Sequence, residues 1–200
     1  MARARSGARA EAKRSLILDA AARVMLEHGY AGVTSRSIGA EAGVQAPLVH
    51  YYFPTLDDLF VALLQRGVEH SKRQFAAALA SPRPLRTLWQ QHLDPRGTSL
   101  TVELVALSNH RPAVRKALVE MSADFQRVQI AGFTELWRRY GVDTELFPPE
   151  LAVIALGGVA RVIVREQAMG MTVGHDAALA AISRLIARLE PEDDQEDEGG

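Results

Sequence analysis

The sequence predicts an all-α protein, and three observations carry that prediction. Apolar residues recur at three- and four-residue steps through most of the 200-residue chain, which is the spacing of a helix face. Alternating apolar runs bounded by turns, which are typical of β-strands, do not occur. Glycine or proline separates the periodic segments, so about nine helices are expected.

The first helix is expected to begin near Leu16 and to end before Gly29. Its inward face consists of apolar residues at helical spacing: Leu16, Ile17, Ala20, Ala21, Val24 and Met25. The preceding segment, 1–15, is interpreted as a basic flexible arm. It contains a single acid and five basic residues: Arg3, Arg5, Arg9, Lys13 and Arg14. Such an arm can neutralise DNA phosphates when it lies beside a DNA-binding motif.

Two short helices follow, joined around one glycine. The first covers 35–42, with Thr34 as its N-cap and Gly43 after its last turn. The second begins near Gln45 and ends before Pro54, because a proline disfavours helical geometry in the residue that precedes it. This arrangement is the helix-turn-helix pattern, whose second helix enters the major groove of DNA.

Six more helices are expected, each bounded by a capping residue, a proline or a glycine. The first of them starts at Thr55, whose side chain caps a turn that carries Asp57 and Asp58. Their ranges are about 55–79, 85–93, 98–109, 112–140, 149–169 and 174–189.

Four sequence stretches connect the N-terminal third to a known family: ILDAA at 17–21, GYAGVT at 29–34, IGAEAGV at 38–44 and LVHYYFP at 48–54. With their spacing, they resemble the N-terminal domain of the TetR family of repressors. The resemblance implies a helix-turn-helix DNA-binding domain at 16–54 and a ligand-binding and dimerisation domain at 55–189. An acidic tail, expected to be disordered, completes the chain at 190–200.

The net charge of −1 hides an opposition between the two ends of the chain. Seven acids lie in the last eleven residues, and without them 23 basic residues face 17 acidic ones. The rest of the chain is therefore positively charged, which favours binding to the phosphates of double-stranded DNA. The predicted DNA-binding residues are Thr34, Ser35, Arg36, Gln45, Ala46, Pro47, His50, Tyr51 and Tyr52.

Five of these side chains suit a particular chemical group of DNA. Gln45 can read adenine with two hydrogen bonds, and Ala46 and Pro47 offer apolar contact to a thymine methyl group. His50 and Tyr51 can donate to phosphate. The alternative is that such residues only support or cover a small helical bundle.

Two positions depart from the family pattern. His50 occupies a position where many relatives have a tyrosine, and Leu56 occupies one where a lysine usually contacts phosphate. Without that lysine we expect DNA binding that is weaker or less salt-sensitive, by roughly one unit of the salt slope.

The segment 151–160 contains ten residues without a polar side chain, so this helix must be covered on more than one side. By resemblance the last two helices form a four-helix interface between two subunits, and a twofold dimer implies a palindromic operator. The predicted dimerisation residues are Ala152, Ala155, Leu156, Val159, Ile163, Ile182, Leu185 and Leu189. Burial of the helix within one monomer is the alternative.

A small apolar or aromatic effector is the third expected partner. The predicted ligand-binding residues are Trp89, His92, Leu93, Leu104, Leu107, Met121, Phe125, Val128 and Phe133. Aromatic and aliphatic side chains with a few polar groups line ligand pockets, but they also form cores.

Other classes of protein find less support in the sequence. The six histidines are never three or four residues apart, and a phosphate-binding loop, a nucleophile elbow and a cysteine are all missing. We therefore expect no enzymatic activity, no metal and no cofactor. An apolar run long enough for a membrane span is also missing, which predicts a cytoplasmic protein. The expected function is a ligand-released repressor that binds DNA as a homodimer, and the alternative is a helical small-molecule-binding or adaptor protein with weak or no sequence-specific DNA binding.

Overall fold

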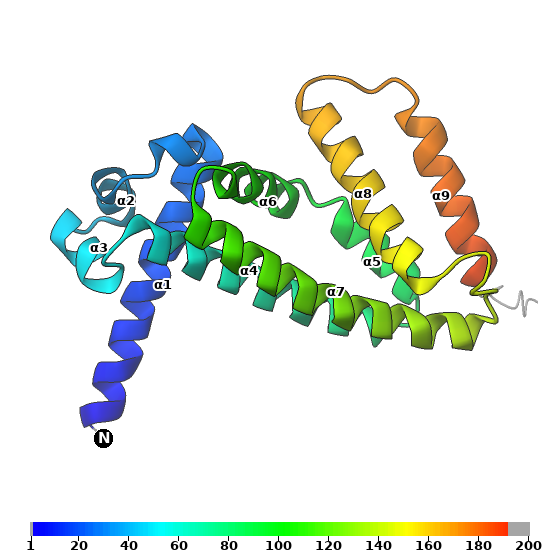
Figure 1. Cartoon of the computed structure of the whole chain (residues 1–200), viewed down its shortest axis with the longest axis horizontal. Coiled ribbons are helices and arrows are strands. Elements are labelled where there is room, and N and C mark those ends of the chain that lie inside the picture. Colours follow the sequence, from blue (N-terminus) through cyan, green and yellow to red (C-terminus); the bar gives the residue numbers. More distant parts are fainter. Residues whose placement is uncertain (1, 192–200) are drawn as a thin grey trace, which may run out of the picture. The chain divides into compact units, whose positions relative to one another are not determined.

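The computed structural model describes residues 2–191, and over that range it contains helices and turns but no β-strand (Figure 1). The predicted all-α fold is confirmed. The described residues form two compact units, one made of 2–71 with 99–125 and the other of 72–98 with 126–191. Two long helices, α4 (Leu56–Leu79) and α7 (Pro112–Tyr140), each contribute residues to both units.

The first unit begins with α1 (Ala2–His28) and the short 3-10 helix η1 (Tyr30–Gly32). The helix-turn-helix pair follows as α2 (Ser35–Ala42) and α3 (Ala46–Tyr52). Most of α6 (Pro95–Ser108) also belongs to this unit.

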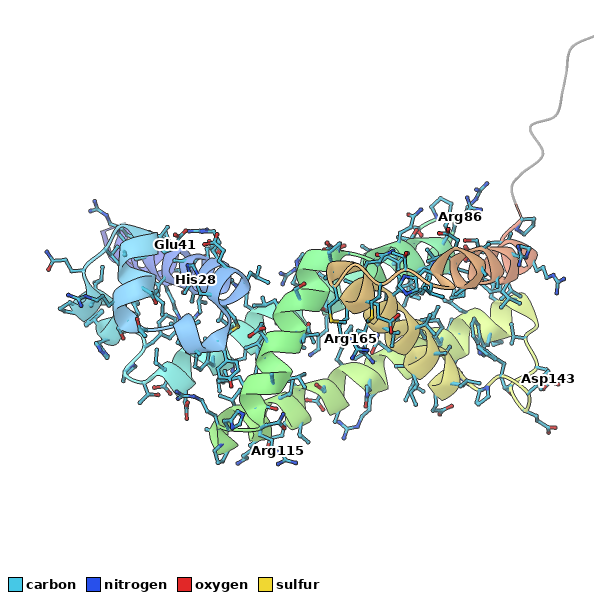
Figure 2. The ribbon with its side chains drawn as sticks, turned by 90° about the horizontal axis from the view of Figure 1, so that it is seen from above. His28, Glu41, Arg86, Arg115, Asp143 and Arg165 are labelled. Atoms are coloured by element: carbon cyan, nitrogen blue, oxygen red, sulfur yellow. The ribbon has the colours of Figure 1, made fainter. Side chains whose placement is uncertain are left out.

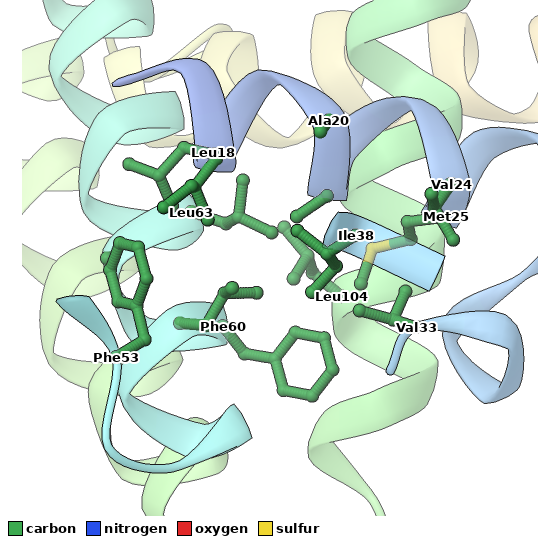
Figure 3. Packing of buried hydrophobic residues seen from close by; sticks show 14 of the residues in the cluster. Leu18, Ala20, Val24, Met25, Val33, Ile38, Phe53, Phe60, Leu63 and Leu104 are labelled. Carbon is green, nitrogen blue, oxygen red and sulfur yellow. The ribbon is translucent and has the colours of Figure 1, made fainter. Parts of the chain in front are cut away.

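One apolar core joins these elements (Figure 3). Its buried side chains come mainly from α1, α2, α3, α4, α6 and α7, and include Leu18, Met25, Ile38, Phe60, Leu63 and Leu104. Removing such side chains from water is the main force that fixes the short helices α2 and α3 against α1.

The second unit contains α5 (Pro84–His92), α8 (Pro149–Ala168) and α9 (His175–Leu189), together with parts of α4 and α7. At its centre the Phe133 ring lies 5.4 Å from the Trp137 ring in an edge-on arrangement and 6.1 Å from the ring of Phe75. The Trp137 indole N–H donates to the backbone oxygen of Phe147 at 2.8 Å, which ties the loop after α7 to the core.

Two element boundaries and one additional element differ from those predicted by the sequence. Residues of the predicted arm are helical, because α1 begins at Ala2 rather than near Leu16. Helix α6 begins at Pro95 rather than at residue 98, since proline is tolerated in a first helical turn. The 3-10 turn η1 was not predicted and lies between α1 and α2.

Glu190 was predicted to start a disordered tail, and the structure corrects this. Its side chain is buried, and its carboxylate accepts the backbone N–H groups of Leu85 at 2.7 Å and Arg86 at 3.1 Å and the Tyr140 hydroxyl at 2.7 Å. The carboxylate thus caps the first turn of α5, where the N-cap Arg83 provides no side-chain hydrogen bond. From residue 192 onward the predicted tail lies outside the described residues.

Candidate nucleic-acid interface

The turn between α2 and α3 is fixed by two glycines. Gly43 has φ of 64° and ψ of 34°, a left-handed conformation that favours glycine, and it ends α2. Gly39 lies where α2 comes close to the turn that follows it, because a Cβ there would be 2.8 Å from the backbone oxygen of Val44 and 3.3 Å from the backbone nitrogen of Ala46. Together they set the angle at which α3 leaves α2.

The start of α2 is closed by the predicted N-cap. The Thr34 hydroxyl accepts the backbone N–H of Ser37 at 3.0 Å, and the Ser37 hydroxyl oxygen accepts the backbone N–H of Thr34 at 2.9 Å. The Ser37 hydroxyl also donates to the backbone oxygen of Gly32 at 2.8 Å, which holds η1 against the first turn of α2. The capping role predicted for Thr34 is confirmed.

Six of the nine predicted DNA-binding residues have exposed side chains: Thr34, Arg36, Gln45, Pro47, His50 and Tyr51. The other three, Ser35, Ala46 and Tyr52, are half-buried. On α3 the split follows helical geometry, because Val49 is buried while Tyr51 is 78% exposed. An imidazole and a phenol are therefore exposed on α3, and the amide of Gln45 is exposed at its N-cap.

One ion pair and one cation–π contact connect α1 to the helix-turn-helix pair. The Arg23 side chain on α1 pairs with Glu41 on α2 at 2.5 Å. The Arg14 guanidinium lies 5.1 Å from the centre of the Phe53 ring, just after α3. Neither contact could be predicted from the sequence, because each joins residues that are far apart in the chain.

Leu56, which replaces the usual lysine, has a role of its own in this structure. Its side chain is half-buried and packs against the core of the first unit. It therefore contributes apolar contact rather than phosphate contact at the start of α4.

The predicted dimerisation residues separate into three groups by exposure. Ala152 and Ile163 are buried within the second unit, whereas Val159 is 36% and Leu185 60% exposed. Ala155, Leu156, Ile182 and Leu189 are half-buried. The prediction omitted three apolar residues that α8 also exposes: Leu151, Ile154 and Val162. The sequence contained a signal for this exposed face, because a spacing of three and then eight residues places the three side chains on one side of a helix.

The predicted ligand-binding residues do not form one group either. Leu104 and Leu107 belong to the core of the first unit. Trp89 and Phe133 are buried in the second unit, and Val128 is 46% exposed. His92, Leu93, Met121 and Phe125 are half-buried.

His92 is the most strongly perturbed of these. Its Nδ1 lies 2.7 Å from the backbone oxygen of Leu88. Burial lowers the pKa of the imidazole below its ordinary value, the contact with Leu88 opposes that shift, and the Arg161 guanidinium adds to it. His92 is therefore held in its neutral form at the end of α5.

Two negative findings concern the described residues only. Residues 2–191 contain no group of three or more histidine, aspartate or glutamate side chains that could hold a metal ion. Within the same range every helix is too short or too polar to cross a membrane.

Comparison with known proteins places this geometry among bacterial regulators. Residues 17–63 match the sequence model of the family described as bacterial regulatory proteins, tetR family. A curated relative, the HTH-type transcriptional regulator BetI of Agrobacterium fabrum (strain C58), is 36% identical over 67 residues, or 34% of this chain. The match covers only 32% of the length of that relative. The match to a second curated regulator covers 54% of that protein's length.

Solved structures extend the likeness beyond the N-terminal third. The multidrug binding protein EbrR, complexed with proflavin, is 30% identical with a TM-score of 0.52 over 86% of this chain and 99% of its own. A TetR transcription regulator from Haloarcula marismortui has a TM-score of 0.69 over 89% of this chain and 98% of its own. At 21% identity, the second likeness concerns the fold alone.

Proposed function

Because the chain belongs to the tetR family of bacterial regulatory proteins, we propose that it binds DNA as a homodimer and represses transcription until a small molecule releases it. The observation that carries this proposal is a set of exposed side chains at α3: Gln45 at its N-cap, and His50 and Tyr51 on the helix itself, which the α2–α3 turn holds at a fixed angle.

The contacts with DNA divide by chemistry. Arg36, exposed in the first turn of α2, neutralises a phosphate, and the exposed Arg9 and Lys13 on α1 supply further positive charge. Gln45 and Pro47 meet base edges from the start of α3. His50 and Tyr51 donate to flanking phosphates.

Dimerisation is supported by the exposed apolar face of α8. Ile154 is 65% exposed, and Leu151 and Val162 are 40% and 44% exposed on the same face. On α9, Leu185 is 60% exposed. Contact between two copies through these faces removes a large apolar surface from water and gives the complex twofold symmetry. A twofold dimer reads a palindrome whose half-sites lie about one helical turn, roughly 34 Å, apart.

Release by a small apolar or aromatic effector is supported by the aromatic interior of the second unit, where Trp89 and Phe133 are buried. It is also supported by EbrR, which is a multidrug binding protein. An effector that binds one conformation of the dimer more tightly shifts the population away from DNA binding.

The test is selection of bound sequences from a random duplex library, at two salt concentrations. We expect a palindrome to be enriched, and its affinity to fall steeply with salt. Gln45→Ala is expected to relax the preference at one base pair, and Arg36→Ala to weaken binding to all sequences and to reduce the salt slope by about one. Arg115→Ala is the matched control, because Arg115 is exposed on α7 outside this face (Figure 2). Retention without any enriched sequence would instead support the helical adaptor alternative.

A further inference from the structure

The first unit contains a cleft of about 580 Å³ whose lining shares only Thr34 with the predicted DNA contacts and only Leu107 with the predicted effector contacts. Three segments that are distant in the sequence form its walls: η1 with the start of α2, the first turn of α4, and the turn from α6 into α7. Its volume falls in the range of small-molecule sites, about 300–1,000 Å³. The residues that matter for recognition are Tyr30, Val33, Leu56, Asp57, His110 and Arg111.

One part of the lining is aromatic and apolar. The rings of Tyr30 and His110 are stacked, with centroids 6.2 Å apart and planes 27° apart, and the imidazole of His110 is exposed. Val33 and Leu56 add aliphatic surface. A flat aromatic ring gains both apolar burial and ring stacking against such a surface.

The other part of the lining is a charged pair whose cation can change partners. The Arg111 guanidinium lies 2.5 Å from an Asp57 carboxylate oxygen and 5.4 Å from the centre of the Phe60 ring. Both members of the pair are about one-third exposed, at 38% for Arg111 and 35% for Asp57. Asp57 lies in the first turn of α4, where the helix dipole stabilises its charge without Arg111. The ring of Phe60 keeps the guanidinium in place when the carboxylate changes.

From this geometry we propose that the cleft binds a small aromatic carboxylate. Its ring packs against Tyr30 and His110, and its carboxylate takes the guanidinium of Arg111 from Asp57 with two parallel hydrogen bonds. The neutral amide of the same compound cannot form that charged pair, so the site selects the anion.

Occupancy of the cleft acts on DNA binding through its walls. Thr34, the N-cap of α2, and the first turn of α4 both line the cleft, so a ligand there contacts the segments that orient the helix-turn-helix. This consequence for DNA rests on the proposed function, whereas binding of the carboxylate itself does not.

Isothermal titration calorimetry of the full chain with 2-naphthoate tests the site directly, with 2-naphthamide as the uncharged probe. We expect saturable binding of one naphthoate per chain and at least about tenfold weaker binding of the amide. Arg111→Gln is expected to weaken naphthoate binding by about tenfold, and Arg115→Gln, one turn further along α7, to leave it unchanged. Asp57→Asn removes the competing carboxylate and is expected to tighten binding by a few fold.

Circular dichroism confirms that each variant is folded, and Arg111→Lys, which keeps the charge but loses the planar fork, is expected to bind with intermediate affinity. The proposal is overturned by an absence of saturable heat up to millimolar naphthoate, by equal binding of the amide, or by a normal affinity in Arg111→Gln. These outcomes are independent of operator selection. Failure to enrich an operator would refute the proposed function while leaving a measured naphthoate site in place.

Discussion

Glu190 joins three parts of the second unit through one carboxylate. It caps the start of α5 through Leu85 and Arg86 and accepts the hydroxyl of Tyr140 near the end of α7. Burial, and then the neighbouring Glu190 carboxylate, raise the pKa of Tyr140 well above its ordinary value, so the phenol remains a donor. The residue therefore contributes to stability although it lies at the edge of the acidic C-terminal segment.

Glu190→Ala is expected to destabilise the protein by about 2 kcal/mol, because two backbone donors and a hydroxyl lose their partner. Urea unfolding followed by circular dichroism measures the change. Glu120→Ala removes an exposed glutamate on α7 and is expected to stay within about 0.5 kcal/mol of the wild type. Equal stabilities of the two variants would contradict the assigned role.

His92 gives the unfolding free energy a pH dependence whose sign follows from burial. Its pKa in the folded protein is below the ordinary value of 6.5, so the unfolded chain binds the proton more readily. Stability is therefore expected to fall as the pH drops through 6.5 and to level off below the pKa of the folded state. Urea unfolding at a series of pH values measures this, and His92→Gln is expected to flatten the curve. An unchanged slope in the variant would assign the effect to another group.

Glu190 and Thr34 show which side-chain contacts can be predicted from the sequence and which cannot. The sequence places Glu190 in an acidic run, and its partners at Leu85 and Arg86 are 105 and 104 residues away. Thr34, by contrast, was recognised as a cap because its partner Ser37 is only three residues further on. Local chemistry is readable from sequence, and pairing across the fold is not.

At the scale of elements, α2 and α3 agree closely with their predicted ranges, and the predicted family resemblance is confirmed. The strong signals were a cap, a left-handed glycine and a proline after the helix. The helical N-terminal part of α1 was missed because its face is charged rather than amphipathic. The turn η1 was missed because three residues carry no periodicity.

The close approach of α2 and α3 yields an element-scale prediction. Gly39→Ala places a Cβ 2.8 Å from the Val44 backbone oxygen, so the helices must separate. We expect a loss of about 1–3 kcal/mol in stability, together with weaker operator binding. Gly67→Ala is the control with the opposite sign: it lies within α4, its new Cβ meets open space, and it is expected to stabilise by about 0.5–1 kcal/mol. Urea unfolding and operator titration of both variants measure these changes, and a Gly39→Ala variant as stable as the wild type would contradict the prediction.

At the scale of the whole molecule, the periodicity of α8 indicated an apolar helix but not which face is covered within the chain. The structure buries Ala152 and Ile163 and exposes Ile154 and Val162. Sequence could not divide these residues because all faces of the helix are apolar over 151–160. The predicted contacts between subunits therefore stay a prediction, now with defined residues to test.

Ile154→Glu and Leu185→Glu are each expected to convert the dimer to monomers, because each buries a charge in an apolar contact between copies. Analytical ultracentrifugation measures the change in mass, and affinity for a full palindrome should fall with it. Val119→Glu, at a side chain on α7 that is 60% exposed, is expected to leave the mass unchanged. If all three variants sediment alike, the subunits associate elsewhere.

The interleaving of the two units has a consequence for how the protein is made. A ribosome delivers the chain from its N-terminus, yet the first unit needs residues up to 125, and 72–98 of the second unit emerge before those. Residues 72–98 therefore cannot complete their packing within the second unit until α9 and Glu190 are synthesised, and their apolar side chains remain exposed until then. We expect the nascent chain to need either rapid folding once synthesis is complete or a chaperone that binds the exposed segment.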